Sequence, residues 1–146
     1  HNMRPTEING LLGLSQLENL DENINIRNSN FMKFLSVLDK NVFKTDFKIE
    51  GCSNYALTLV MRDKDFKLRD EIEKTLSEHN IEFRRGLSGG GNQLRQPYLK
   101  NRIEIPSLAT FPEVEHIHHF AWYIGNYPDL ESKKIDYLGE ILANIL

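Results

Sequence analysis

Cysteine is nearly absent from this sequence, since Cys52 is the only one among 146 residues. An internal disulfide is therefore excluded. The chain also lacks any apolar stretch of roughly 18 residues, the length expected of a membrane span. The polar N-terminus lacks the basic segment and short apolar run of a signal peptide. These absences favour a soluble protein of a reducing compartment, and we expect a cytoplasmic location without a membrane partner.

An excess of basic charge is missing as well. The 18 basic residues are outnumbered by 21 acidic ones, which gives a formal net charge of -3. Such a balance provides no general attraction to nucleic acid or to an anionic membrane surface. A length of 146 residues with 40% hydrophobic content is sufficient for one domain with its own core.

The first forty residues predict a long helical region. Pro5 suits the first turn of a helix, and Glu7 favours the positive end of the helix dipole. Apolar residues surround much of this helix, which suggests burial on two sides: Ile8, Leu11, Leu12, Leu14, Leu17 and Leu20. A second helical pattern extends to Leu38, but several asparagines weaken it. We expect a bend or break between Asp21 and Asn30.

The remaining residues alternate between strand and helix patterns. We predict strands over 55–61, 81–84 and 122–127, and helices over 65–79, after a Thr110–Glu113 capping box, and after an Asp129 cap. Asn80 should adopt the left-handed conformation that ends a helix. The predicted fold class is α/β, specifically an α+β two-layer unit: a long N-terminal helix followed by a small, mainly antiparallel sheet with helices packed on one face.

Two segments carry groups suited to anions. Asn2 and Arg4 offer a neutral donor and a planar guanidinium just ahead of the first helix. Residues 81–98 combine backbone freedom at several glycines with the positive charge of Arg84, Arg85 and Arg95. From the bare patterns alone, a solvated terminus and a mobile glycine loop are the commoner outcomes.

Other reactive side chains give weaker patterns. His116 and His119 lie one helical turn apart but lack a third ligand at suitable spacing, so we predict no metal site. Cys52 has no base beside it, which argues against a catalytic thiol. In the aromatic segment 120–128, Trp122 fits core packing better than sugar stacking.

Taken together, these segments resemble the DegT or StrS family of sugar aminotransferases and dehydratases, which use pyridoxal phosphate. The resemblance rests on Asn-x-Arg-x-x-Glu at residues 2–7, Gly-Leu-x-Gln-Leu at 13–17, and the segments 81–98 and 120–128. In the family the first motif follows the cofactor domain. The resemblance therefore implies the C-terminal small domain of a larger enzyme, with residues 1–40 as an inter-domain helix region and 41–146 as a small α/β domain.

The resemblance also implies roles for individual residues. Asn2 would reach the cofactor phosphate of the partner subunit in a homodimer, and Arg4 would line the substrate site. Arg84 and Asn92 would contact the substrate, with Arg85 and Arg95 as weaker candidates. The Ile-Glu-x-Arg, Gly-Asn and Gln-Pro elements are similar to those of the nucleotide-sugar 3-dehydratase branch. His1 departs from the aromatic residue that is usual in the family.

The implied enzyme uses pyridoxal 5'-phosphate or pyridoxamine 5'-phosphate and acts on a nucleotide-linked 4-keto sugar in deoxysugar or lipopolysaccharide biosynthesis. Its cofactor lysine, or the histidine that replaces it in dehydratases, would precede residue 1. We therefore assign no catalytic residue here and expect an isolated chain that is inactive and binds no cofactor. Two alternatives stay open: a module that binds a phosphorylated ligand through the glycine-rich loop, and a dimerisation domain that uses the first helix.

Overall fold

Three antiparallel strands form the sheet of this domain. The structure, a computed structural model, describes residues 6–86, 91–99, 104 and 106–146. Strand β3 (Ala121–Gly125) lies in the centre, between β1 (Ala56–Val60) and the two-residue strand β2 (Phe83–Arg84). Both pairings are antiparallel, with Thr58 opposite Tyr123 and Arg84 opposite the same tyrosine.

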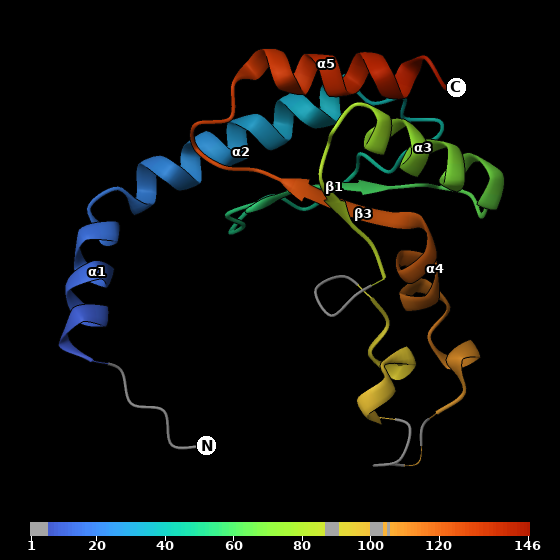
Figure 1. The fold of residues 1–146 in the computed structure, drawn as a ribbon, viewed down its shortest axis with the longest axis horizontal. Coiled ribbons are helices and arrows are strands. Elements are labelled where there is room, and N and C mark those ends of the chain that lie inside the picture. The colour runs from blue at the N-terminus through green and yellow to red at the C-terminus, as the bar shows by residue number, and fades with distance from the viewer. Residues whose placement is uncertain (1–5, 87–90, 100–103, 105) are drawn as a thin grey trace.

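Helices α2 (Leu20–Val37), α3 (Phe66–Glu78) and α5 (Ser132–Ala143) cover one face of this sheet (Figure 1). Helix α4 (Pro112–Phe120) leads directly into β3, and α1 (Glu7–Leu17) extends away from the sheet. This arrangement confirms the predicted two-layer fold with helices on one face.

Alternation along the strands places the core between the sheet and these helices. The buried side chains Leu57, Leu59, Trp122 and Ile124 belong to one face of the strands, and Thr58 and Tyr123 to the other. The helices contribute residues at three-four spacing to the same core: Phe31, Phe34, Ile72, Leu76, Ile135, Leu138 and Leu142. Ala56, Val60 and Ala121 on this second face are buried, whereas Thr58 and Tyr123 are only partly buried. The second face, called the open face below, is therefore open around Thr58 and Tyr123.

The predicted bend between Asp21 and Asn30 is wrong. The break lies at Glu18 and Asn19, and α2 runs without interruption through the asparagine-rich segment. Distant partners satisfy these asparagines: Asn54 donates to Asn28 at 2.8 Å, and Asn30 donates to the buried Asn126 at 3.2 Å. Tertiary contacts therefore outweigh low helix propensity.

Two predicted helix starts are also wrong. Thr110 ends a short 3₁₀ turn, and α4 begins two residues later at Pro112, which suits the first helical position because its missing N–H needs no partner there. The residue before it, Phe111, provides no side-chain cap. Helix α5 begins at Ser132 rather than after Asp129, because the Leu130 N–H donates to the Tyr127 carbonyl in a turn that first redirects the chain. The left-handed conformation of Asn80 is confirmed, with φ of 56°.

Helix α1 leaves its apolar residues uncovered by the described chain. Its large side chains are each between 60% and 70% exposed: Ile8, Leu11, Leu12, Leu14 and Leu17. The predicted burial of this helix on two sides therefore does not occur within the described residues. In that part of the chain, no helix combines the length and apolarity required to cross a bilayer.

Candidate functional site

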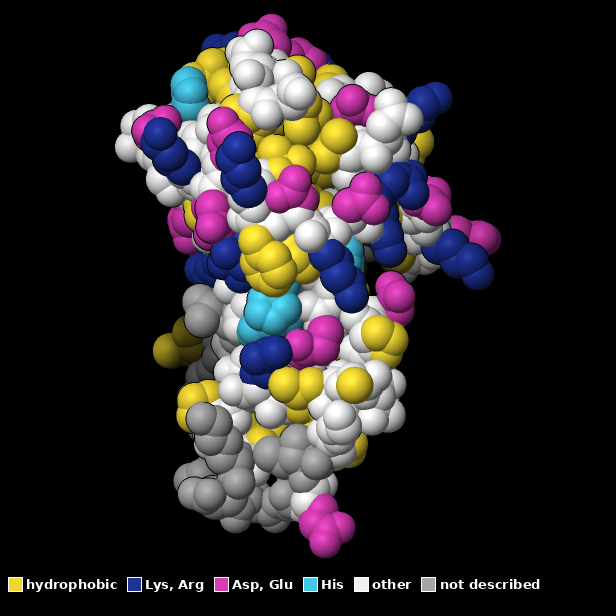
Figure 2. Space-filling view, turned by 90° about the vertical axis from the view of Figure 1, so that its right-hand side faces the viewer, with side chains coloured by type: hydrophobic (Ala, Val, Ile, Leu, Met, Phe, Trp, Pro, Cys, Tyr) yellow, Lys and Arg dark blue, Asp and Glu magenta, His cyan; other side chains and the backbone are white. Residues whose placement is uncertain are grey.

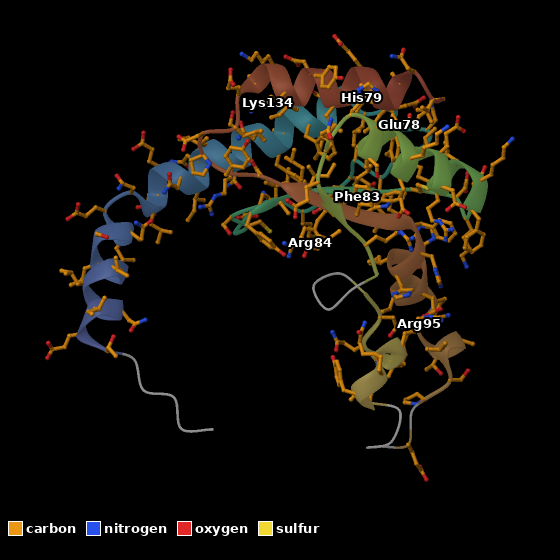
Figure 3. The ribbon with its side chains drawn as sticks, viewed as in Figure 1. Glu78, His79, Phe83, Arg84, Arg95 and Lys134 are labelled. Atoms are coloured by element: carbon orange, nitrogen blue, oxygen red, sulfur yellow. The ribbon has the colours of Figure 1, made fainter. Side chains whose placement is uncertain are left out.

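Arg84 presents a guanidinium on the open face of the sheet (Figure 3). It lies opposite Tyr123 in the β2–β3 pair, and its Cζ atom is 6.0 Å from the centre of that ring. Tyr55 lies beside Tyr123, with ring centres 6.2 Å apart. Hydrogen bonding to Tyr123, supported by the charge of Glu82, raises the pKa of Arg84 above its ordinary value. The open face therefore combines a permanent cation with two phenol rings.

Two hollows meet at these three residues. One, of about 390 Å³, lies on the open face, and its lining includes Asn54, Thr58 and Ile117. The other, of about 720 Å³, extends towards His79 and Tyr137, where the end of α3 meets α5. Both volumes fall in the range of small-molecule sites. Aromatic rings beside a guanidinium suit a ligand that carries an anionic group and a ring.

Arg85, the next residue along the chain, is bound on the other side of the strand. Its guanidinium donates two hydrogen bonds to the Glu73 carboxylate of α3, one of them at 3.3 Å. The Trp122 indole N–H donates to the same carboxylate at 2.7 Å. Burial alone would raise the pKa of Glu73, but the hydrogen bonds from Arg85 and Trp122 and the Arg85 charge lower it overall. The guanidinium of Arg85 is thus neutralised within the domain.

A second polar cluster joins the segment after β2 to α4. Glu115 accepts hydrogen bonds from Asn92 Nδ2 at 2.5 Å and from Arg95 Nη2 at 2.6 Å. The Asn92 backbone N–H donates to His118 Nδ1 at 3.1 Å. Histidine side chains gather next to basic and acidic ones on this side of the molecule (Figure 2). The cluster fixes the segment from Asn92 to Arg95 against α4.

The charges of this cluster shift its titrations. The Arg95 hydrogen bond, opposed by burial and supported by Asn92, lowers the pKa of Glu115 to about 2. Burial, the neighbouring His119 when it is protonated, and the positive charge of Arg95 lower the pKa of His118. Burial and Arg95 likewise lower the pKa of His119. At neutral pH the cluster therefore holds an ionised carboxylate and favours the neutral form of both imidazoles.

The predicted site residues have different surroundings. Asn2 and Arg4 lie outside the described residues, as do Gly89 and Gly90 of the glycine-rich loop. Arg84 is exposed on the open face, whereas Asn92 is 2% exposed and its side chain is bonded to Glu115 and to the Leu94 N–H. The weaker candidates also have partners, because Arg85 is paired with Glu73 and Arg95 with Glu115.

Some contributing residues were not predicted from sequence. Tyr123 lies beside Arg84, and Tyr55 lies beside Tyr123. Alternation from the buried Trp122 could have indicated that Tyr123 faces outwards. No local pattern indicates Glu73 as the partner of Arg85. Packing of Trp122 is confirmed, since that side chain is 1% exposed.

The histidine cluster is accounted for by structural contacts. His116 is buried, and its Nε2 lies 2.7 Å from the Met61 carbonyl oxygen. His119 Nε2 lies 3.7 Å from Glu115. In the ranges that the structure describes, no group of three or more histidine, cysteine or acidic side chains could hold a metal ion.

The open-face hollow does not by itself fit a pyridoxal cofactor. Such a cofactor requires a lysine or equivalent base, a carboxylate at the ring nitrogen, and several donors for the phosphate. The lining of this hollow includes one cation, Arg84, and neither a lysine nor a carboxylate. These groups would have to come from other residues than those that line it.

The fold is a small antiparallel sheet with helices on one face and an exposed arginine near two tyrosines on the other. The chain belongs to the DegT/DnrJ/EryC1/StrS aminotransferase family, whose model matches residues 1–143. It is 27% identical over 148 residues to the lipopolysaccharide biosynthesis protein RfbH of Salmonella typhimurium, covering 94% of this chain and 32% of that protein. A GDP-4-keto-6-deoxy-D-mannose 3-dehydratase of Escherichia coli O55:H7 is 23% identical, over 97% of this chain and 36% of the relative.

Solved structures share the fold. A GDP-4-keto-6-deoxymannose-3-dehydratase with a trapped PLP-glutamate geminal diamine has a TM-score of 0.78 at 23% identity, covering 97% of this chain and 36% of that one. The Helicobacter pylori aminotransferase PseC, involved in pseudoaminic acid biosynthesis, also has a TM-score of 0.78, at 19% identity, over 99% of this chain and 38% of that one. The chain thus spans about a third of the length of the relatives that it matches.

Proposed function

We propose that this chain is the C-terminal small domain of a nucleotide-sugar enzyme that uses pyridoxal or pyridoxamine phosphate. In this proposal the intact enzyme is a cytoplasmic homodimer of deoxysugar or lipopolysaccharide biosynthesis. Residues 1–40 form the helix region between domains, and residues 41–146 form the small domain. Family membership over residues 1–143, together with the span of about a third of its relatives, supports this proposal.

The substrate would lie against the open face of the sheet. Arg84 would bind an anionic oxygen of the nucleotide diphosphate, because it is a permanent cation whose nearest carboxylate, at 3.6 Å, belongs to the exposed Glu82. Tyr55 and Tyr123 would pack against a ring of the substrate. Arg4 would add a second contact to the substrate.

The cofactor would be held mainly by residues outside this chain. When bound, it supplies the electron sink for chemistry next to the keto carbon. Asn2 would donate to its phosphate across the dimer interface. The contribution of the small domain is to orient the substrate and to exclude water from the reacting end.

Asn92 has a supporting place in this scheme. Its amide is bonded to Glu115 and its backbone to His118. In the described arrangement it therefore fixes the segment that follows the glycine-rich loop. A direct contact between Asn92 and substrate would require the amide to exchange its bond with Glu115 for one with the ligand.

Dehydration of a 4-keto-6-deoxy sugar is our preferred reaction. The Ile-Glu-x-Arg, Gly-Asn and Gln-Pro elements favour it, as do relatives named as 3-dehydratases at 23% and 25% identity. The fold does not discriminate, because a dehydratase and an aminotransferase have the same TM-score of 0.78. Amino transfer is the alternative reaction at the same site.

Reconstitution tests the proposal. The 146-residue chain and a longer polypeptide extended upstream in the same reading frame are each incubated with pyridoxal phosphate, glutamate and GDP-4-keto-6-deoxymannose. We expect cofactor absorbance and substrate consumption only with the longer polypeptide. Release of the C3 hydroxyl as water indicates dehydration, and an amino sugar indicates transfer. Turnover or stoichiometric cofactor uptake by the 146-residue chain would contradict the division of labour proposed.

A dimerisation role for the first helix is the second candidate. The exposure of five large apolar side chains on α1 favours it, because soluble proteins rarely leave such a surface uncovered. This role is compatible with the enzymatic proposal, since the same helix can lie at an interface of the intact enzyme.

A further inference from the structure

Strand β2 holds Arg84 with very little sheet pairing. The strand contains two residues, Phe83 and Arg84, which pair with Ile124 and Tyr123. It is also the outer strand of the sheet. A two-residue edge strand has few ladder hydrogen bonds and opens more easily than a central strand. Contacts other than the backbone hydrogen bonds between β2 and β3 must therefore help to fix the position of Arg84.

Glu73 is hydrogen-bonded to the sequence neighbours of Arg84 and Tyr123, the two residues on the open face. Arg85 follows Arg84 and gives both of its hydrogen bonds to this carboxylate. Trp122 precedes Tyr123, and its indole N–H donates at 2.7 Å to Glu73 Oε1, the oxygen that also accepts from Arg85 Nε. Adjacent residues of a strand point to opposite faces. The Glu73 carboxylate, on the helix-covered face of the sheet, thus fixes the backbone beside Arg84 and Tyr123, whose side chains lie on the open face.

The site of this carboxylate favours strong bonds. The side chains of Glu73 and Arg85 are 24% and 22% exposed, and Trp122 is almost fully buried. The other nearby cation, Arg69, is bonded to Asp70 and lies 4.7 Å from the centre of the Phe66 ring. Arg85 is therefore the cation that Glu73 binds directly. A charged bond that is partly shielded from water is stronger than an exposed one.

We propose that Glu73 is a positioning residue for substrate binding, which acts through Arg85 and Trp122 to align Arg84 with Tyr123 on the open face. Glu73 itself does not touch the substrate. The proposal rests on the proposed function for its consequence in catalysis. Its structural part, the alignment of β2 on β3, stands independently of the reaction.

Hydrogen exchange on the 146-residue chain tests the structural part. In Glu73→Gln the bond from Trp122 can persist, but the ionic bond to Arg85 is lost. We expect the protected amides of residues 83–85 to exchange about tenfold faster, the size expected for loss of a charged hydrogen bond. The amides of β1 should keep their rates. Glu71→Gln, at an exposed position of the same helix, is the matched control and should change neither.

Equal exchange of residues 83–85 in Glu73→Gln and Glu71→Gln would overturn the proposal. A general loss of protection in Glu73→Gln would also mean that the carboxylate supports the whole fold rather than this strand. In that event, the double variant with Glu73→Gln and Arg85→Gln, which leaves no unpaired charge, distinguishes positioning of β2 from support of the whole fold. Faster exchange confined to residues 83–85 in this double variant supports positioning, and unchanged exchange refutes it.

Steady-state kinetics of the longer enzyme test the consequence for substrate. We expect Arg84→Gln to raise KM about tenfold or more, and Glu73→Gln to raise it severalfold with little change in kcat. Because Glu73 aligns Arg84 with Tyr123, most of its effect on KM should be absent once Arg84 is replaced, so the double variant should have a KM close to that of Arg84→Gln alone. Independent, multiplying effects would overturn the positioning role. An unchanged KM in Arg84→Gln would instead contradict the proposed substrate contact, and the exchange experiment would still decide the alignment.

Discussion

Removing the charge of Glu115 should loosen the segment that follows the glycine-rich loop. Glu115 accepts hydrogen bonds from Asn92 and from two nitrogens of Arg95, and its side chain is 18% exposed. In Glu115→Gln the amide oxygen can keep one of these bonds, but the ionic attraction to Arg95 is lost. Asn92 and Arg95 would then retain fewer contacts with α4.

The pKa of Glu115 sets the size of the effect. A value of about 2, against an ordinary 4.5, corresponds to about 3 kcal/mol when each pKa unit is worth about 1.4 kcal/mol. Arg95 is 37% exposed, so solvent screens part of this attraction. We therefore expect Glu115→Gln to lower the free energy of unfolding by about 1 to 2 kcal/mol at pH 7.

The stabilising contribution of Glu115 should decrease as the pH falls. The folded-state pKa of Glu115 is depressed, so its contribution is fully present above pH 4.5 and is lost as pH falls towards 2. Urea unfolding at pH 7 and at pH 3 should show the difference between wild type and variant shrinking in acid. Glu113→Gln is the matched control, because Glu113 is 82% exposed and lies 3.9 Å from Lys44.

A carboxyl resonance of Glu115 that titrates near pH 4.5 would refute the reasoning. The same conclusion would follow if Glu115→Gln and Glu113→Gln had equal stabilities at pH 7. Hydrogen exchange can show whether the loss is local to residues 91–95 or extends to the core.

Three further predictions concern the fold. Gly139→Ala should lower the free energy of unfolding in urea by about 1 to 2 kcal/mol, because the added Cβ would lie 2.7 Å from Val37 Cγ2. Gly13→Ala should raise it by up to about 1 kcal/mol, because no atom lies within 4 Å of the added Cβ and alanine favours the helix. Equal effects would show that α2 and α5 do not approach as described. By NMR, the pKa of His118 should lie below 6.5. Because this folded-state pKa is lowered, the free energy of unfolding should fall as pH drops below 6.5. An unshifted pKa would contradict the burial of His118 beside His119 and Arg95. The chain should self-associate in sedimentation velocity, and the double variant with Leu11→Lys and Leu14→Lys should self-associate less. A monomeric wild type would contradict association through the apolar surface of α1.

Local pattern was sufficient for much of the fold. The strand at 55–61 and the helix at 65–79 were predictable because strand formers and three-four spacing are both strong there. The core contacts of Ile135, Leu138 and Leu142 followed from the same spacing. Where one face of an element is clearly apolar, the packing that buries it is largely determined.

Distant partners explain what the sequence did not reveal. The helix α2 persists because Asn30 bonds to Asn126, 96 residues away. Arg84 and Arg85 are equivalent in sequence, but Glu73 engages only one of them. Asn92 looked accessible in a glycine-rich loop, and its partner Glu115 lies 23 residues later. Each of these outcomes depends on a side chain that local pattern cannot select.

The affinity of the longer enzyme for GDP, measured by titration calorimetry, tests most directly whether the open sheet face binds the anionic end of the substrate. Arg84→Gln should weaken GDP binding about tenfold or more. Arg62→Gln, which removes an arginine bonded to Asp46 and to the Lys40 carbonyl, should leave it unchanged. Equal affinities for wild type and Arg84→Gln would contradict the placement of the nucleotide on this face.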